Sequence, residues 1–213
     1  MTPPPGMRRH ELESTDPALF AEIAARAEIG HLVIVTPDGW PRAVAVNFCA
    51  LGPRIYFHGA LAGEKFAVAA APGGARAGFT MNLPHAMIPS TWTAPGFACP
   101  ATHFFKSVEI KGRCTLVDAP AEKAAALQAL MQKYQPEGGF DPIDPADRRY
   151  AKALAGVGVY RVDAESWTGK MKFGQNEPAK LRRRFVAELR GRGRPIDLLT
   201  ADEIERTLAG DEG

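Results

Sequence analysis

Between residues 30 and 60, short runs of β-branched and aromatic residues alternate with tight turn signals. The run His31–Thr36 ends at Pro37-Asp38-Gly39, and the run Arg42–Phe48 is followed by Gly52-Pro53 and by a third run, Arg54–Phe57. Turns this short join antiparallel neighbours, because a parallel pair needs a crossover of about a dozen residues or more. The sequence therefore predicts an antiparallel meander.

The rest of the chain predicts a small barrel with peripheral helices, because about six strands are separated by regularly spaced turns. The irregular stretch Leu83–His103 contains four prolines and Trp92, and we expect a lid or an interface arm there. Thr200 is expected to cap the last helix in a capping box with Glu203. The further strands are expected at Arg76–Met81, Phe104–Val117 and Val157–Val162, and the helices at Ala18–Ala27, Gly63–Ala71, Ala119–Tyr134, Pro145–Ala155, Ala179–Arg190 and Thr200–Leu208.

The composition is that of a soluble globular protein, with 46% hydrophobic and 23% charged residues among 213. No apolar run approaches the roughly 18 residues that span a bilayer, and the N-terminus lacks the apolar core of a secretory signal. The cysteines are few and widely spaced, as expected of reduced thiols in a cytoplasmic protein. They are Cys49, Cys99 and Cys114. No spacing among the histidines predicts a metal site.

Positive charge is concentrated between Lys170 and Arg194, where nine basic residues face two acidic ones, a local excess of +7. Such an excess indicates an anionic partner: a phosphate, a nucleic acid or an acidic face of a second subunit. The cluster at 180–184 has no interleaved aromatic residues and no preceding helix-turn-helix pattern, so a solvated helix face is its simplest interpretation.

The segment Ile55–Lys65 combines a strand, a small-residue turn and a helix start that carries Lys65. Backbone N–H groups at a helix start and one ammonium can bind a phosphate together. A lysine at this point opposes the helix dipole unless an anion lies there, although it could also be an ordinary exposed lysine. His58 is open to two interpretations, a structural histidine at a strand end or a group that contacts a ligand.

Five segments in this order resemble the FMN-binding split-barrel proteins related to pyridoxamine 5′-phosphate oxidase, and among them the nitroimidazole-resistance-type branch. The resemblance covers roughly residues 10–173. It predicts a lead-in over residues 1–15, an FMN-binding split-barrel domain over 16–173 and a basic helical extension over 174–213. The segments are Gly39–Phe48, Ile55–Gly59, Gly63–Lys65, Lys106–Arg113 and Tyr160–Lys170.

The resemblance implies a mainly β (α+β), six-stranded antiparallel split barrel that forms a homodimer with FMN between the subunits. The strand from Arg42 to Asn47 would lie along the isoalloxazine ring, and Lys106 and Ser107 would reach the cofactor across the interface. Trp167 and Lys170 would close over the site, although Trp167 could equally plug one end of the barrel. The implied cofactor-binding residues are Arg42, Ala43, Val44, Ala45, Val46, Asn47, His58, Gly59, Lys65, Lys106, Ser107, Trp167 and Lys170.

The turn Ala60–Lys65 departs from the pyridoxamine phosphate oxidases proper, since it carries one lysine in place of a Ser/Thr-Arg-Lys cluster. We therefore expect a flavin-dependent reductase of a small organic acceptor in place of a vitamin B6 oxidase. NAD(P)H would be a transient electron donor, and His58 is the candidate catalytic residue. Two alternatives remain open: a flavin-binding transcriptional regulator that uses the basic tail, and a haem-binding split-barrel protein.

Overall fold

The structure is a computed structural model that describes residues 8–211, and it divides into two compact units. We call residues 17–81 and 108–168 the barrel unit. The terminal unit comprises residues up to 16, residues 82–107 and residues from 169 onward. The boundaries fall within three strands, so each of these strands contributes residues to both units.

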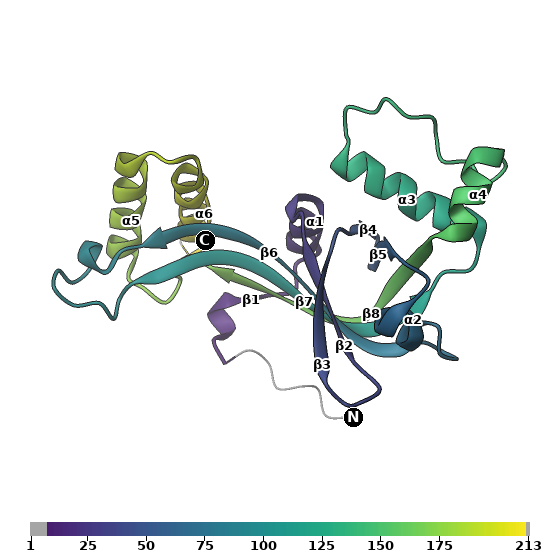
Figure 1. Cartoon of the computed structure of the whole chain (residues 1–213). Coiled ribbons are helices and arrows are strands. Elements are labelled where there is room, and N and C mark those ends of the chain that lie inside the picture. Colours follow the sequence, from purple (N-terminus) through teal and green to yellow (C-terminus); the bar gives the residue numbers. More distant parts are fainter. Residues whose placement is uncertain (1–7, 212–213) are drawn as a thin grey trace. The chain divides into compact units, whose positions relative to one another are not determined.

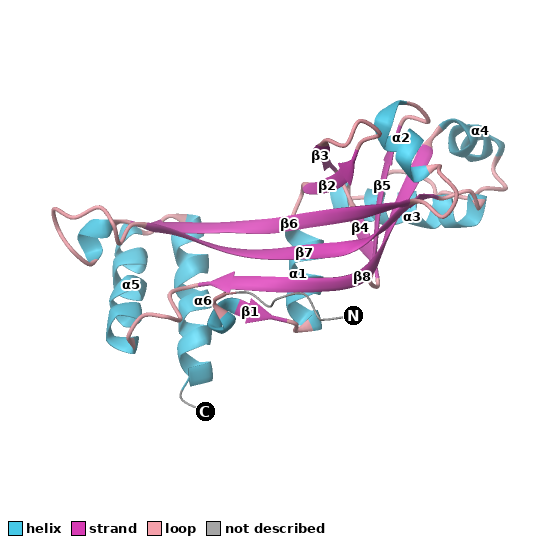
Figure 2. Cartoon of the chain, turned by 90° about the horizontal axis from the view of Figure 1, so that it is seen from below, coloured by secondary structure: helices cyan, strands magenta, loops and turns pink. Residues whose placement is uncertain are grey.

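The strands form one sheet in the order β3-β2-β6-β7-β8-β5-β4, with β1 paired to β8 (Figures 1 and 2). Every pair with a defined register is antiparallel. Two strands are very short, and the other six account for the predicted split barrel. The bounds are β1 Glu13–Ser14, β2 Gly30–Val35, β3 Pro41–Val46, β4 Cys49–Leu51, β5 Arg54–Gly59, β6 Ala75–Ile88, β7 Thr102–Leu116 and β8 Gly158–Lys172.

In the barrel unit, the predicted meander is confirmed only for its first hairpin. The predicted pairing of Arg42–Phe48 with Arg54–Phe57 is wrong, because β5 pairs with β4 and β8, and β3 pairs with β2. The β2–β3 hairpin runs from Gly30↔Val46 to Val35↔Pro41, and Gly39 supplies the positive φ of 88° that its turn requires. The core contains stacked aromatic rings, among them Phe57 and Tyr160 with centroids 5.3 Å apart. The helices of this unit are α1 Pro17–Arg26, α2 Gly63–Ala69, α3 Pro120–Tyr134 and α4 Arg148–Gly156.

In the terminal unit, the helices α5 (Ala179–Arg192) and α6 (Pro195–Asp211) lie side by side and share one core with β6 and β7. Phe104 contributes from β7, Phe173 from the residue directly after β8, and Phe185 and Ile204 from the helices. Two 3₁₀ turns complete the unit, η1 at His10–Leu12 and η2 at Ser90–Trp92. The lead-in expected over residues 1–15 is structured from residue 10, and residues 1–7 lie outside the described part.

The prediction of an irregular stretch from Leu83 onward is wrong for roughly its first third, because the strand β6 continues to Ile88. Proline ordinarily argues against a central strand. Pro84, however, lies beyond Met81, where the pairing of β6 with β2 ends, so its missing N–H costs no hydrogen bond to β2. Its side chain is exposed while Leu83 and His85 are buried, and the strand alternation continues through the proline.

Two predicted helix starts are also wrong. α4 begins three residues later than expected, and its N-cap is Asp147, which accepts a hydrogen bond from the Arg149 N–H at 2.8 Å. α6 begins at Pro195, so Thr200 is an interior residue that accepts from the Ala86 N–H at 2.9 Å. The Thr200 hydroxyl thereby fastens α6 to β6. No helix among the described residues is long and apolar enough to cross a membrane.

Candidate functional site

Three of the predicted segments meet in the barrel unit through a short chain of contacts. Arg42 of β3 forms an ion pair with Glu64 in the first turn of α2. The next residue, Lys65, extends to the end of β5, where its ammonium lies beside Gly59. A Cβ on Gly59 would be 2.5 Å from the Lys65 Nζ, so the glycine leaves the space that the ammonium takes. The fold therefore places two cations, Arg42 and Lys65, and the Glu64 carboxylate together where β3, the end of β5 and the start of α2 meet. We call this the Arg42–Lys65 edge.

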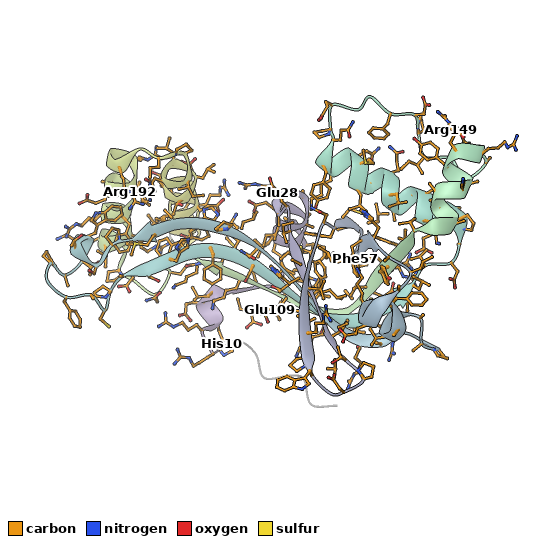
Figure 3. All side chains as sticks on the ribbon, in the orientation of Figure 1. His10, Glu28, Phe57, Glu109, Arg149 and Arg192 are labelled. Carbon is orange, nitrogen blue, oxygen red and sulfur yellow. The ribbon has the colours of Figure 1, made fainter. Side chains whose placement is uncertain are left out.

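The Lys65 ammonium is half-buried and has aromatic rings as its neighbours. Its Nζ lies 4.8 Å from the centroid of Tyr160 and 5.5 Å from that of Phe57, which Figure 3 labels on β5. It makes no hydrogen bond or ion pair with any residue in the described range. Burial lowers the pKa of Lys65, because the charged form has lost part of its hydration. The site therefore holds a partly desolvated cation that lacks a counterion.

Two other half-buried lysines of the same unit have definite structural partners. Lys133 donates to three backbone carbonyls at 2.7–3.0 Å, two of them at the end of α1. Lys123 donates to the carbonyls of Leu154 and Val157 at 3.2 Å, at the end of α4. Both lysines satisfy carbonyls that a helix end leaves free. Lys65 donates to no backbone carbonyl among the described residues.

A hydrogen bond from β8 holds the turn between β5 and α2, since the Tyr160 hydroxyl donates to the Ala60 carbonyl. Gly63 has a φ of 82°, which favours glycine at the point where the chain enters α2. α2 has only seven residues, and Glu64 already places a negative charge in its first turn. The capacity for an external anion thus rests on the Lys65 and Arg42 side chains more than on the helix dipole.

β3 is an edge strand whose side chains are largely exposed although they are apolar. Ala43 and Ala45 are exposed, Val44 is half-buried and Val46 is buried. Trp40, directly before β3, is 72% exposed, and Val35, which pairs with Pro41, is 60% exposed. Soluble proteins usually protect such an edge with charge, proline or a covering element. β3 thus has the character of a surface that a ligand or a partner covers.

The remaining predicted residues of the barrel unit lie at its edges. The His58 side chain is exposed at the end of β5 and makes no hydrogen bond with any residue described here. The Asn47 amide donates to the Glu28 carbonyl at 3.4 Å, at the opposite end of β3 from Arg42. Trp167 packs against Phe20 of α1 with ring centroids 5.3 Å apart, as expected if it plugs the barrel.

Three predicted residues belong to the terminal unit and are not part of this chain of contacts. Lys106 is buried, and its Nζ lies 2.8 Å from the Glu203 carboxylate. Ser107 is half-buried next to it on β7. Lys170 extends over the ring of Phe105, with its Nζ 5.4 Å from the centroid. Lys106 therefore has a structural partner of its own.

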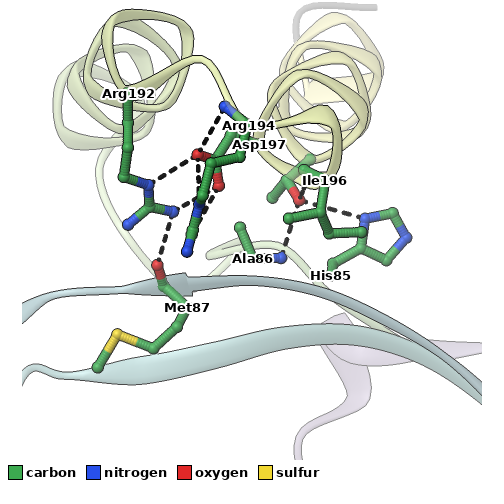
Figure 4. Close-up of polar contacts among 8 residues, drawn as sticks. His85, Ala86, Met87, Arg192, Arg194, Ile196 and Asp197 are labelled. Carbon is green, nitrogen blue, oxygen red and sulfur yellow. Dashed lines mark hydrogen bonds and ion pairs between the residues drawn. The ribbon is translucent and has the colours of Figure 1, made fainter.

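Several cations of the basic window, residues 170–194, form ion pairs with carboxylates of this chain. Asp197 lies between Arg192 and Arg194 at 2.6 and 2.9 Å, and Arg192 also donates to the Met87 carbonyl of β6 (Figure 4). Arg190 pairs with Asp202 and Glu205. The acidic residues of α6, which follow the window directly, thus neutralise much of the positive charge.

The family model described as pyridoxamine 5′-phosphate oxidase matches residues 17–171. This chain belongs to that family. The match covers the strands and turns that carry Arg42, Gly59 and Lys65, and it ends near the end of β8. No curated protein matches the chain.

Several solved structures have the same fold as this chain, with low sequence identity to it. A protein described as a 5-nitroimidazole antibiotic resistance protein, from Bacteroides thetaiotaomicron, is 22% identical over 75% of this chain and 86% of its own, with a TM-score of 0.58. The flavocytochrome Anf3 of Azotobacter vinelandii is 22% identical over 78% and 72%, with a TM-score of 0.65. An FAD and haem binding protein of Mycobacterium smegmatis is 17% identical over 80% and 78%, with a TM-score of 0.62. These likenesses confirm the split-barrel fold.

The sequence did not predict which residues surround Lys65. Tyr160 comes from β8, about a hundred positions away, and only the β5–β8 register Phe57↔Tyr160 brings it under the ammonium. Glu64 was visible as an acidic neighbour, but its pairing with Arg42 depends on how β3 and α2 meet. A glycine at the end of a strand, Gly59, was the one local signal of a close approach.

Proposed function

We propose that this chain is a flavoprotein that binds FMN at the Arg42–Lys65 edge and transfers electrons to a small organic acceptor. The observation that carries the proposal is the half-buried Lys65 ammonium, which has aromatic neighbours and no counterion among the described residues. A phosphate would supply the missing negative charge. Membership of the pyridoxamine 5′-phosphate oxidase family makes a flavin phosphate the most economical source of that charge.

The residues present fit such a group. Lys65 and Arg42 would hold the phosphate, and Arg42 would then exchange its Glu64 partner for the ligand. The exposed small side chains Ala43 and Ala45 would let a flat ring lie against β3, with free backbone groups of the edge strand as hydrogen-bond partners. Bound flavin supplies hydride and electron transfer, which no side chain here can perform. The protein supplies position and charge.

His58 is the candidate proton donor of the proposed reaction. It is exposed at the end of β5, one residue before Gly59, and its imidazole is not engaged with the described residues. Histidine is a common general acid in enzymes, so His58 could give a proton to a reduced acceptor. A reduced nicotinamide would act as a transient electron donor.

The proposed assembly is a homodimer that covers β3. An uncovered apolar edge strand beside exposed Trp40 and Val35 is the pattern that a second subunit would protect. In that assembly the partner would complete the wall of the flavin site. Analytical ultracentrifugation tests this part of the proposal directly, and a monomer at micromolar concentration would contradict it.

The deciding experiment is the absorbance spectrum of the purified chain, followed by titration with FMN. We expect two broad flavin bands, and FMN released on denaturation and identified by mass. A single intense Soret band would instead indicate haem. A colourless protein that does not bind added FMN would overturn the proposal.

A further inference from the structure

The terminal unit contains a cavity of its own that the proposed flavin site does not use. Its volume is about 440 Å³, within the range of about 300–1,000 Å³ that small-molecule sites occupy. Its walls come from the residues before η1, the loop between β6 and β7, the last residues of β8 and the start of α5. All of these segments belong to the terminal unit.

Positive charge dominates the lining. Arg8, Arg9, Lys170 and Lys172 face one carboxylate, that of Glu177, which accepts a hydrogen bond from the Asn176 amide. None of the four cations forms an ion pair with any residue from 8 to 211. Lys172 donates only to the Thr102 hydroxyl. This contrasts with α5 and α6 nearby, where Arg190, Arg192 and Arg194 all have carboxylate partners.

Three of the four cations are close enough for the charges of two to act on the third. Burial lowers the pKa of Lys172, and the charges of Lys170 and Arg9 lower it further. Such repulsion destabilises the unit unless an anion offsets it. A structural role would be better served by apolar side chains or by a salt bridge, so the uncompensated charge points to a ligand.

The cavity also offers aromatic surface. The Phe105 ring lies under both lysines, with Lys170 Nζ at 5.4 Å and Lys172 Nζ at 6.0 Å, and Phe104 and Phe185 form deeper walls. Arginine side chains provide planar surfaces on which a base can stack. A simple inorganic anion would use the charge and leave this apolar surface and most of the volume unfilled.

We propose that this cavity binds the nucleoside diphosphate part of a dinucleotide, with the diphosphate at the four cations and the base at the aromatic wall. The adenosine diphosphate half of FAD and that of a reduced nicotinamide dinucleotide have the same chemistry. The proposal rests on residues of the terminal unit alone, so it does not depend on FMN binding at Lys65.

The chain carries its own reporter for this site. Cys99 lines the cavity and is exposed, whereas Cys49 and Cys114 are buried. Burial raises the pKa of Cys49 to about 11 and that of Cys114 to about 12, so both thiols stay protonated and react slowly. A neutral thiol reagent such as N-ethylmaleimide should therefore modify Cys99 first in the native full-length chain.

The test measures the rate of Cys99 modification, by intact mass, with increasing ADP. If bound ADP shields Cys99, the modification rate is proportional to the fraction of sites that are free. We therefore expect about tenfold slower modification when ADP is about ten times its dissociation constant. Adenosine alone should give little protection. The double variant Lys170→Gln/Lys172→Gln should lose the protection, and Arg8→Gln/Arg9→Gln tests the same site if the first variant fails to fold.

The matched control is Lys180→Gln, which removes an exposed lysine that does not line the cavity and should leave protection intact. FAD that protects while FMN does not would assign the ligand to the flavin, and NADPH that protects would assign it to the electron donor. Unchanged rates at millimolar ADP, or protection that persists in both double variants, would overturn the proposal. Equal protection by inorganic pyrophosphate and ADP would refute the base contact.

Discussion

Replacement of Lys65 by methionine separates a ligand-binding lysine from a structural one, because the two roles predict opposite effects on stability. Methionine keeps an apolar stem over Tyr160 and removes the charge. If the ammonium pairs with a flavin phosphate, its loss costs the complex about 1.5–3 kcal/mol, the value of a hydrogen bond to a charged group. That corresponds to a roughly 10- to 150-fold larger dissociation constant for FMN.

The same substitution should not destabilise the ligand-free protein. The ammonium is partly desolvated, and only the two ring faces compensate it. Its removal therefore takes away an uncompensated cost, and we expect the free energy of unfolding to rise or to stay within about 0.5 kcal/mol. Sites kept for function commonly show this exchange of stability for activity.

The matched control is Lys133→Met in the same unit. Its ammonium donates to the carbonyls of Ala24, Ala27 and Phe48. Its loss leaves the Ala24 and Ala27 carbonyls without this donor, while the Tyr134 hydroxyl still donates to the Phe48 carbonyl. We expect a loss of about 1–3 kcal/mol in stability with unchanged FMN affinity in the folded fraction. The assays are fluorescence titration with FMN and urea unfolding monitored by circular dichroism. A Lys65→Met protein that binds FMN like the wild type, or that loses stability as Lys133→Met does, would refute the reasoning.

Three further substitutions test neighbouring parts of the structure. Glu64→Gln releases Arg42 from its ion pair, so FMN should bind a few times more tightly by the same titration; weaker binding would contradict competition between Glu64 and the phosphate. Ala45→Lys places a charge on the exposed edge strand and should shift the sedimentation of a dimer to that of a monomer. Asp197→Asn removes the carboxylate that Arg192 and Arg194 share, and should lower stability by about 2 kcal/mol. In the wild type, hydrogen bonds from Arg192 and then Arg194 hold the pKa of Asp197 below its ordinary value of about 3.8. The stability that Asp197 contributes is therefore fully present above that pH and is lost as the pH falls further. Acid unfolding of both proteins should show the stability difference between wild type and Asp197→Asn shrinking at low pH.

The fold was predictable where local signals determine topology. The Gly39 turn predicts the β2–β3 hairpin, and the Gly52-Pro53 turn lies in a second hairpin, β4–β5. The meander was wrong at its third strand, because the short strand β4 takes the place beside β5 that was predicted for β3. The prediction was wrong at Pro84 and at Thr200 because both depend on distant partners. Pro84 is tolerated where β2 stops, and Thr200 is interior because its hydroxyl meets β6. Neither partner is visible in the local sequence.

The candidate site shows the same division between local and distant information. Lys65 and Gly59 could be found because strand, turn and helix start are adjacent in sequence. The terminal cavity could not, since Arg8 and Lys170 are more than 150 positions apart and meet only because β1 pairs with β8 through Glu13↔Lys170. Nothing in the periodicity of β8 indicates that its last lysines share a cavity with the start of the chain.

The strongest charge signal in the sequence leads to a last prediction, that this chain does not bind nucleic acid through its basic window. Binding to a phosphate backbone needs cations that can release counterions from it. Arg190, Arg192 and Arg194 instead pair with Asp197, Asp202 and Glu205, so they would have to give up these partners first. In a gel-shift assay at low salt we therefore expect no mobility change with genomic fragments. A shift that weakens steeply with added salt, and that Arg183→Gln/Arg184→Gln abolishes, would show that the charge outside these pairs suffices for binding and would restore the regulator as a function.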